Sequence, residues 1–251
     1  MCLDSSSRYS LAYALQDRNL KDEAQEQWLL LQRIGHPEDT TVTLANQHLG
    51  NFVAEKDPLA ACDYWEQLRF HLLKPTTNLV EQTGYLDLGV SIHRARARGL
   101  LAKGDKAGAL DQLKVCNDLI PGYIKVVEEF HPLLRKAGLA TEADELFENS
   151  FKIFSESARQ YPDSAAQANN AAWVAALTGK RLDEALALAE RAVKLSPESP
   201  SYADTMAEVQ FARGDREQAL TWARKAVELD PEAKLYAERL EAFAKRELPR
   251  K

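Results

Sequence analysis

The sequence predicts an all-α protein, a solenoid of about six antiparallel helix pairs followed by a capping helix. The first observation is an internal repeat: DEALALAERAVKLSP and EQALTWARKAVELDP align at an offset of 34 residues, from Pro197 to Pro231. A fixed period of this length indicates a repeated structural unit. The second is composition. The 251 residues include only 11 Gly and 10 Pro, are rich in Ala, Leu, Glu, Lys and Arg, and lack the alternating Val, Ile and Thr runs of strands.

Each copy has the pattern of two helices joined by a tight turn. In the second copy, one helical run ends at Gly214, and the next starts after Asp215 and ends before Pro231. Glycine supplies a left-handed helix end, Asp can cap the following helix, and Pro cannot continue one. The second helix carries a stripe of small residues that lets the two helices approach closely. The stripe consists of Ala219, Ala223 and Ala226.

In both copies these landmarks resemble the tetratricopeptide repeat. They are a small residue in the first helix, a turn Gly, two Ala in the second helix and a closing Pro: Ala172, Gly179, Ala185, Ala192 and Pro197, then Ala207, Gly214, Ala219, Ala226 and Pro231. One departure is Ala203, which stands where a large aromatic residue is usual. The resemblance implies a right-handed α-solenoid whose first helices line a concave wall that binds a peptide segment or a partner helix.

The turns of the two copies differ in length. Gly179 lies six residues before Ala185, whereas Gly214 lies five residues before Ala219. We therefore expect a turn one residue longer in the first copy.

Two weaker copies begin the chain. The first covers residues 5–37, with Asn19 as its left-handed turn residue, because Asn is the commonest substitute for Gly in that conformation. The second covers about 41–75, where Pro58 starts the second helix.

The third and fourth units are longer. The third has a first helix over roughly 78–103, in which Arg96 stands at an expected apolar position. In the fourth, Pro132 falls within the first helix and would kink or start it, and the second helix runs to about Tyr161. The prolines that close the units are spaced 34 to 46 residues apart along the chain: Pro37, Pro75, Pro121, Pro162, Pro197 and Pro231.

We expect one continuous solenoid in three parts. Residues 1–163 form degenerate repeats, residues 164–233 form two well-matched repeats, and residues 234–251 form a capping helix and a short tail. Residues 1–6 show no polar capping helix. Self-association through that end of the stack is therefore an open alternative.

Charge and hydropathy restrict the partners. The net charge is −6 with both signs interspersed, which argues against nucleic acid and anionic membranes. The longest apolar run, Ala171–Leu177, is far shorter than the roughly 20 residues that span a bilayer. The first residues lack the pattern of a signal peptide. The cysteines Cys2, Cys62 and Cys116 are far apart, which indicates reduced thiols and a cytoplasmic protein.

No catalytic or metal-binding pattern stands out. The five histidines lack metal spacing, and Gly179–Lys180 lacks the rest of a phosphate loop. We expect Cys62 and Cys116 to be buried structural thiols. The basic run at 93–99 is either a solvated helix face or a site for an anion or acidic peptide. The sequence thus predicts neither a cofactor nor a metal.

The resemblance places a set of side chains on the concave wall: Tyr9, Tyr13, Gln47, His48, Asn51, Arg94, Arg98, Asn169, Asn170, Trp173, Asp204 and Glu208. Asn170 is the most specific of them, because its amide can donate to and accept from a peptide backbone at once. The alternative for each residue is an ordinary solvated surface. The basic clamp that some repeats use for a C-terminal carboxylate is missing, since Asp204 and Thr205 stand at such positions.

The wall would therefore suit a protein segment of mixed charge with some hydrophobic side chains. We expect a non-enzymatic interaction scaffold whose partner the sequence does not identify. The alternative is the docking or regulatory portion of a larger enzyme.

Overall fold

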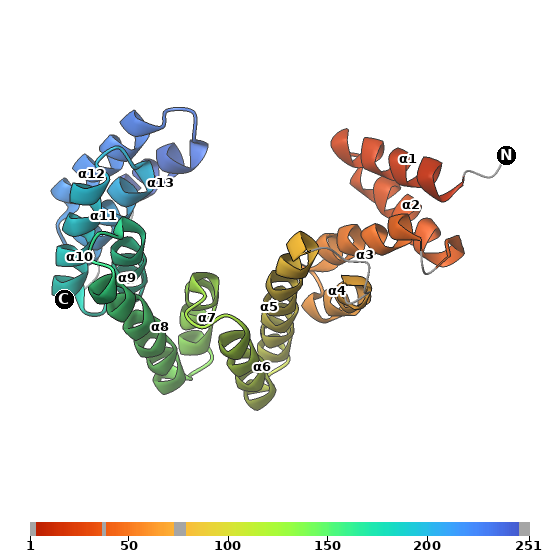
Figure 1. The fold of residues 1–251 in the computed structure, drawn as a ribbon, viewed down its shortest axis with the longest axis horizontal. Helices are drawn as coiled ribbons and strands as arrows, with labels where there is room; N and C mark the ends of the chain where they lie inside the picture. Colours follow the sequence, from red (N-terminus) through yellow and green to blue (C-terminus); the bar gives the residue numbers. More distant parts are fainter. Residues whose placement is uncertain (1–3, 37–38, 73–78, 246–251) are drawn as a thin grey trace. The chain divides into compact units, whose positions relative to one another are not determined.

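A computed structural model describes residues 4–36, 39–72 and 79–245, and all regular structure in these ranges is α-helical (Figure 1). The predicted all-α fold of paired helices is confirmed. The helices are α1 (Ser5–Asp17), α2 (Lys21–Ile34), α3 (Thr40–Val53), α4 (Pro58–Leu72), α5 (Leu79–Ala102), α6 (Lys106–Leu119), α7 (Ile124–Lys136), α8 (Ala140–Gln160), α9 (Ala165–Thr178), α10 (Leu182–Leu195), α11 (Pro200–Ala212), α12 (Arg216–Leu229) and α13 (Lys234–Lys245).

The helices gather in two compact units. Unit 1 is Met1–Ile120 and contains α1 to α6, and unit 2 is Pro121–Lys251 and contains α7 to α13. The boundary expected near residue 163 falls inside unit 2, between α8 and α9. A single continuous solenoid stays a prediction. None of the described helices combines the length and the apolar character needed to cross a membrane.

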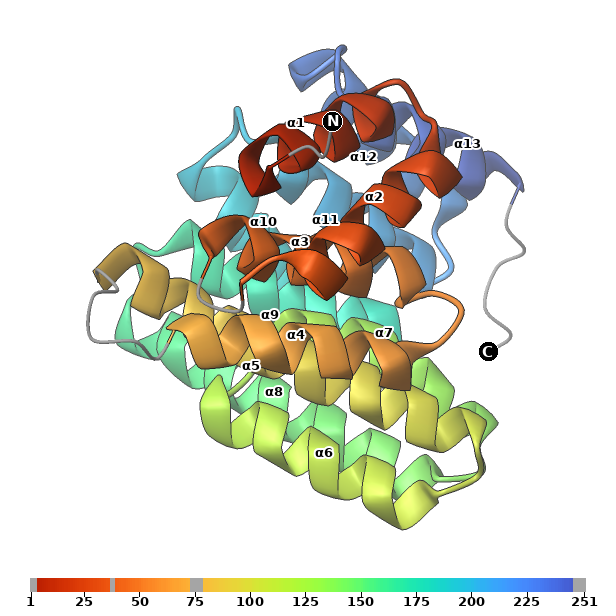
Figure 2. The same ribbon diagram turned by 90° about the vertical axis from the view of Figure 1, so that its right-hand side faces the viewer.

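In unit 1 each helix packs against the next along the chain, as can be followed in Figures 1 and 2. Two apolar clusters of described residues contribute to its core. Trp28, Leu31 and Leu49 anchor the cluster between the first two pairs. Trp65 and Ile92 belong to the cluster between α4 and α5. The large side chains that the sequence spaces at helical periodicity are therefore the ones that join the pairs.

Unit 2 has the small-residue packing that the repeats predict. The second helices bury alanine stripes: Ala185, Ala189 and Ala192 on α10, and Ala219, Ala223 and Ala226 on α12. First helices also contact one another, α7 with α9 and α9 with α11, while α13 packs on α12. Small side chains let helix axes approach closely. The aromatic rings of Phe147 and Phe211 complete the core and are fully buried.

The turns confirm the left-handed residues. Asn19, Gly179 and Gly214 have φ of 60°, 70° and 90°. The longer turn expected in the first well-matched copy is wrong, because residues 179–181 and residues 213–215 both link their helices with three residues. The additional residue lengthens α9 relative to α11 instead, and Arg181 takes a second left-handed conformation at φ 49°.

Two other sequence features have local explanations. Pro132 neither starts nor ends a helix, since α7 runs through it with the proline on the exposed side. Arg96 is half-buried and donates to Glu66 of α4 at 3.1 Å, which explains a charged residue at an expected apolar position. The closing residues Pro37 and Pro75 and the tail at 246–251 lie outside the described residues.

The expected structural thiols are confirmed, because Cys62 on α4 and Cys116 on α6 are both buried. Burial is the main cause that raises the pKa of Cys62 from 9.0 to about 11. A thiolate is the reactive form, so we expect iodoacetamide at pH 7.5 to alkylate Cys62 about 100-fold more slowly in the native protein than in urea. Mass spectrometry of timed samples measures both rates. Equal rates in the two states would contradict this prediction.

Candidate functional site

Every predicted wall residue lies on the first helix of a pair. We call the surface formed by these helices the first-helix face: α1, α3 and α5 in unit 1, and α7, α9 and α11 with α13 in unit 2. The two faces differ in how much of their predicted surface is accessible.

Four rings form a compact cluster on the unit 1 face. The imidazole of His48 stacks on Trp28 with a centroid distance of 4.3 Å and an interplanar angle of 1°. Tyr9 meets Trp28 edge-on at 5.1 Å, and Tyr13 meets His48 edge-on at 6.1 Å. Trp28 is fully buried, whereas Tyr13 is 46% exposed. The cluster therefore connects the core of unit 1 to its surface.

A cavity of about 500 Å³ opens beside this cluster. Trp28, His48 and Phe52 supply its apolar lining, and the predicted wall residue Asn51 also lines it. Charged side chains of both signs complete the lining: Lys21, Asp22, Glu55 and Lys56. Apolar surface with a few polar groups is typical of binding sites. Gln47 and Asn51 are both exposed.

The imidazole of His48 makes the stability of unit 1 depend on pH. Burial lowers the pKa of His48 below its ordinary value of 6.5. The unfolded chain therefore binds this proton more readily, and stability should fall as pH drops through 6.5 toward the lower native pKa. We expect urea denaturation at pH 7.5 and 5.5 to show a larger loss for the wild type than for His48→Gln. The prediction fails if both proteins lose equal stability.

The arginines predicted for the middle of the wall lie on α5 and are half-buried. A guanidinium nitrogen of Arg98 donates to the Ala54 carbonyl at 3.4 Å, which ties α5 to the end of α3. In the same basic run, His93 hydrogen-bonds Gln112 at 2.8 Å. These members of the run thus make contacts within unit 1, and a binding role for Arg94 and Arg98 stays a prediction.

The first-helix face of unit 2 is crossed by a chain of polar contacts. Trp173 on α9 donates its indole N–H to Glu128 Oε1 on α7 at 2.6 Å. The guanidinium of Arg239 on α13 lies over the ring of Trp173, 4.9 Å from its centroid. On α11, Asp204 Oδ1 accepts from Arg239 Nε at 2.5 Å, and Glu208 Oε2 accepts from Nη2 at 2.9 Å. These contacts link five side chains from the four helices of this face.

Asp204 and Glu208, expected as acids at the end of the wall, are buried against α13. Their side chains are 10% and 6% exposed, and that of Arg239 is 24% exposed. Burial raises the pKa of Asp204 above its ordinary value, although Arg239 acts in the opposite direction. Buried carboxylates need a compensating cation, and the guanidinium supplies it.

Sequence reasoning missed Arg239 because a capping helix at the end of a stack gives no reason to expect a buried ion pair. The repeat period contained part of the missing signal. Arg239 follows Asp204 by 35 residues, as Asp204 follows Asn169. One step of the 34-residue repeat from Asp204 falls on Glu238, so the period places this turn of α13 opposite Asp204 without singling out Arg239.

Asn169 and Asn170 on α9 are both half-buried. The side-chain oxygen of Asn169 is shielded from solvent and has no hydrogen-bond partner among the described residues. A ligand cannot reach that oxygen directly. The peptide-binding role expected of Asn170 stays a prediction.

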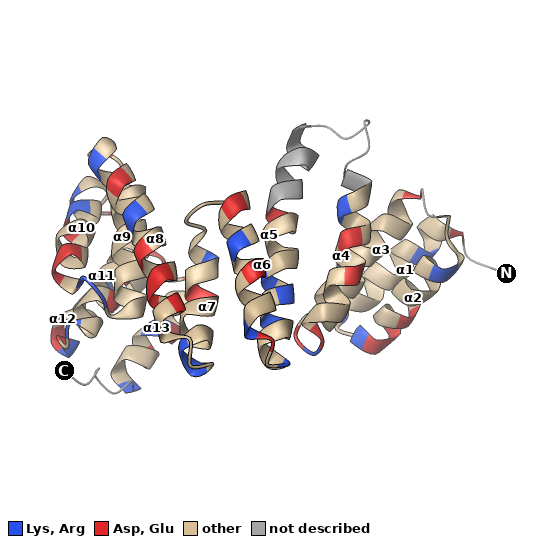
Figure 3. Cartoon of the chain, turned by 90° about the horizontal axis from the view of Figure 1, so that it is seen from below, with Lys and Arg blue, Asp and Glu red and all other residues tan. Residues whose placement is uncertain are grey.

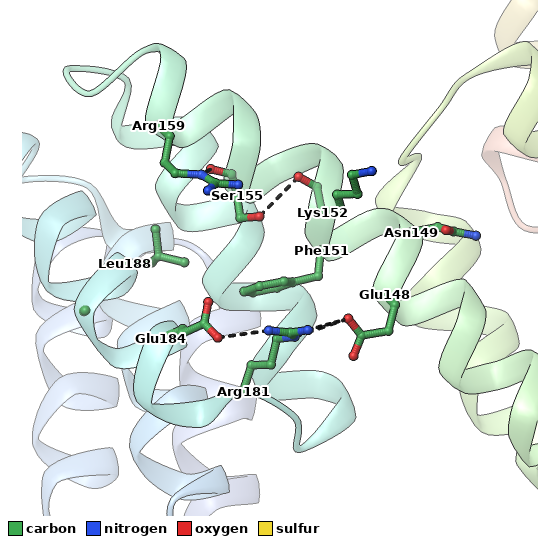
Figure 4. A pocket seen from close by; sticks show the side chains of 10 residues that line it. Glu148, Asn149, Phe151, Lys152, Ser155, Arg159, Arg181, Glu184 and Leu188 are labelled. Atoms are coloured by element: carbon green, nitrogen blue, oxygen red, sulfur yellow. Dashed lines mark hydrogen bonds and ion pairs between the residues drawn. The ribbon is translucent and has the colours of Figure 1, made fainter.

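A second cavity, of about 610 Å³, lies on the second helices α8 and α10, where no site was predicted (Figure 4). Phe151 and Leu188 give it an apolar lining. Arg181 bridges Glu148 at 2.8 Å and Glu184 at 3.1 Å along one edge. This arrangement satisfies the charge of Arg181 within unit 2.

Among the residues that Figure 3 colours by charge, basic and acidic residues both occur on the helices of each unit. Among the described residues, no group of three or more His, Cys, Asp and Glu side chains is arranged to hold a metal ion.

Comparison with known proteins identifies one repeat. Residues 201–225, on α11 and α12, match the family model described as tetratricopeptide repeat. No curated protein matches the chain.

Several solved structures match the chain at low similarity. The assembly chaperone of RpL4, Acl4, is 14% identical, with a TM-score of 0.44 over 97% of this chain and 96% of that one. A tetratricopeptide repeat protein from Parabacteroides merdae is 16% identical, with a TM-score of 0.41 over 96% and 99%. YrrB, a repeat protein with an unusual peptide-binding site, is 15% identical, with a TM-score of 0.34 over 95% and 92%.

Proposed function

We propose, on the premise that the chain is a tetratricopeptide-repeat protein, that it is a non-enzymatic scaffold that binds a segment of another protein through its first helices. The segment carries charges of both signs and at least one apolar side chain. Its contacts include the exposed residues Tyr13, Gln47 and Asn51 of unit 1.

The observation that carries the proposal is the cavity beside the aromatic cluster of unit 1. His48 and Phe52 offer a partly exposed apolar surface, backed by the buried ring of Trp28, on which a hydrophobic anchor of the segment would pack. Charged residues of both signs around it, such as Asp22 and Lys56, match a segment of mixed charge. A buried aromatic centre with a polar rim is typical of protein interfaces that concentrate binding energy in a few residues.

A capture experiment tests this function. The tagged full chain is used to recover proteins from its native host, and the amounts recovered are compared between the wild type and the double variant Tyr13→Ala/Asn51→Ala. We expect at least about a tenfold loss of one specific partner, since interface anchors contribute about 2 kcal/mol or more each. Circular dichroism verifies that the helices remain.

The matched control changes the exposed residues of α2 in the same unit, Glu26→Ala/Arg33→Ala. This variant should recover the partner as the wild type does. Unchanged recovery by Tyr13→Ala/Asn51→Ala would exclude the unit 1 face as the binding surface. Equal losses in both double variants would indicate a general effect of surface charge or stability.

A further inference from the structure

The three-sided enclosure of the Arg239 guanidinium has the features of a binding site. An indole face lies 4.9 Å from the guanidinium, and two carboxylates on one helix accept from two different nitrogens at 2.5 and 2.9 Å. A planar guanidinium can make both hydrogen bonds and still stack, whereas the ammonium of lysine has no such fork. The enclosure formed by Trp173, Asp204 and Glu208 therefore selects arginine.

The enclosure belongs to α9 and α11, and only its occupant belongs to α13. Trp173 is held separately by its hydrogen bond to Glu128 on α7. Asp204 and Glu208 lie one helical turn apart on α11, within the tetratricopeptide repeat match. The three receptor side chains thus lie on α9 and α11, which pack against each other. The contact between these two helices does not involve α13.

The occupant helix is attached by few side chains. α13 has 12 residues, and Phe243 is its only described residue that is fully buried. The ring of Phe243 packs against the ring of Phe211, with 5.4 Å between their centroids. Arg216 donates hydrogen bonds to the backbone carbonyls of Phe243 and Ala244 at 2.8 and 3.0 Å. Leu240 also packs against this cluster. An isolated helix of this length is marginal in water, so α13 depends on its contacts with α11 and α12. Terminal elements with few buried contacts open at low free energy.

We propose that Trp173, Asp204 and Glu208 form a receptor for an arginine of a partner protein, and that Arg239 occupies this receptor in the free protein as an internal competitor. The inference rests on the proposed scaffold function for its partner. It adds a second surface, on unit 2, that becomes available when α13 is displaced.

The internal occupant indicates the chemistry of the partner. Arg239 and Phe243 are four residues apart on α13, so both point to the same side of that helix. The guanidinium fills the acidic receptor, and the phenyl ring packs on Phe211. A partner that replaces both would present an amphipathic helix with an arginine and, four residues later, an aromatic or large apolar residue.

A competition experiment with a defined peptide tests the proposal. The probe is a fluorescent, blocked peptide with the sequence of residues 234–245, KLYAERLEAFAK, and a second peptide carries neutral citrulline in place of its arginine. Fluorescence anisotropy measures the binding of both peptides to the full-length wild type, to Arg239→Ala and to Glu238→Ala. Glu238 is exposed on the same helix and serves as the matched control.

We expect Arg239→Ala to bind the arginine peptide at least about tenfold more tightly than the wild type or Glu238→Ala, because the internal competitor is removed. The citrulline peptide should show no such gain, and Arg239→Ala/Trp173→Ala should lose it. Equal binding by Arg239→Ala and the wild type, or equal gains for both peptides, would overturn the proposal. A concentration-dependent dimer that is lost in Arg239→Ala would assign the receptor to a second copy of the chain and overturn it as well.

The test remains decisive if Arg239→Ala loses helicity. In that case, recovery of the circular dichroism signal with the arginine peptide and not with the citrulline peptide supports the receptor, and no recovery contradicts it. The result is also separable from the proposed function. Failure of Tyr13→Ala/Asn51→Ala to affect partner capture would remove the unit 1 surface, whereas the peptide assay reports on unit 2 alone.

Discussion

Replacing Trp28 with alanine is expected to lower the unfolding free energy of unit 1 by about 3–5 kcal/mol, the usual cost of removing a large buried aromatic side chain. Trp28 is 1% exposed and is packed by Tyr9 at 5.1 Å and His48 at 4.3 Å. Its removal leaves a cavity between α1, α2 and α3, and it takes away the ring on which His48 stacks. Urea denaturation followed by circular dichroism measures the change.

Two variants distinguish cavity formation from a general effect of substitution in this cluster. Trp28→Phe keeps an aromatic ring and should lose less than the alanine variant. Tyr13→Ala removes a ring that is 46% exposed, so it should cost about 1 kcal/mol or less. A Trp28→Ala protein as stable as Tyr13→Ala would show that the aromatic cluster contributes little to the core of unit 1.

The helices and their turns were predictable because their signals are local. Asn19 and Gly214 both take left-handed φ values at helix ends, and Pro58 starts α4. Each depends on the backbone preference of a residue and its immediate neighbours. The alanine stripes of α10 and α12 were also predictable, since a buried face repeats every three to four residues.

The division into two units was not predictable in the same way. It depends on which helices contact each other, and the sequences of α6 and α7 show only that each helix has residues to bury. Helical periodicity shows that a helix has a buried face, but it does not identify the helix that covers that face.

The candidate site was predictable in its positions but not in its pairings. The resemblance to a known repeat placed Asn51 and Trp173 on first helices, where they lie. The cavity of unit 1 depends on the stacking of His48 on Trp28, a residue of the second helix that the wall pattern does not include. The burial of Asp204 likewise depends on a side chain one repeat further along the chain.

Replacing Arg239 with alanine should destabilise unit 2 by about 3 kcal/mol at pH 7, the lower end of the usual cost of removing one partner from a buried ion pair. While α13 stays docked, the carboxyl groups of Asp204 and Glu208 remain buried without the guanidinium that compensates them. The alanine variant also loses the stacking contact with Trp173. Chemical denaturation monitored by circular dichroism gives the difference between the two proteins.

If the stability lost in Arg239→Ala comes from uncompensated carboxylates, the loss should depend on pH and should be reduced by neutral substitutions of those carboxylates. Burial raises the pKa of Asp204 above its ordinary value, and removal of Arg239 takes away an influence that lowers it. The native variant then holds this proton more tightly than the unfolded chain, so its deficit should shrink as pH falls from 7 toward about 4. Adding Asp204→Asn and Glu208→Gln to Arg239→Ala should recover part of the loss at pH 7, because the buried groups are then neutral. A deficit that is independent of pH and of these neutral substitutions would mean that Arg239 stabilises α13 through packing on Trp173 and Phe243 alone.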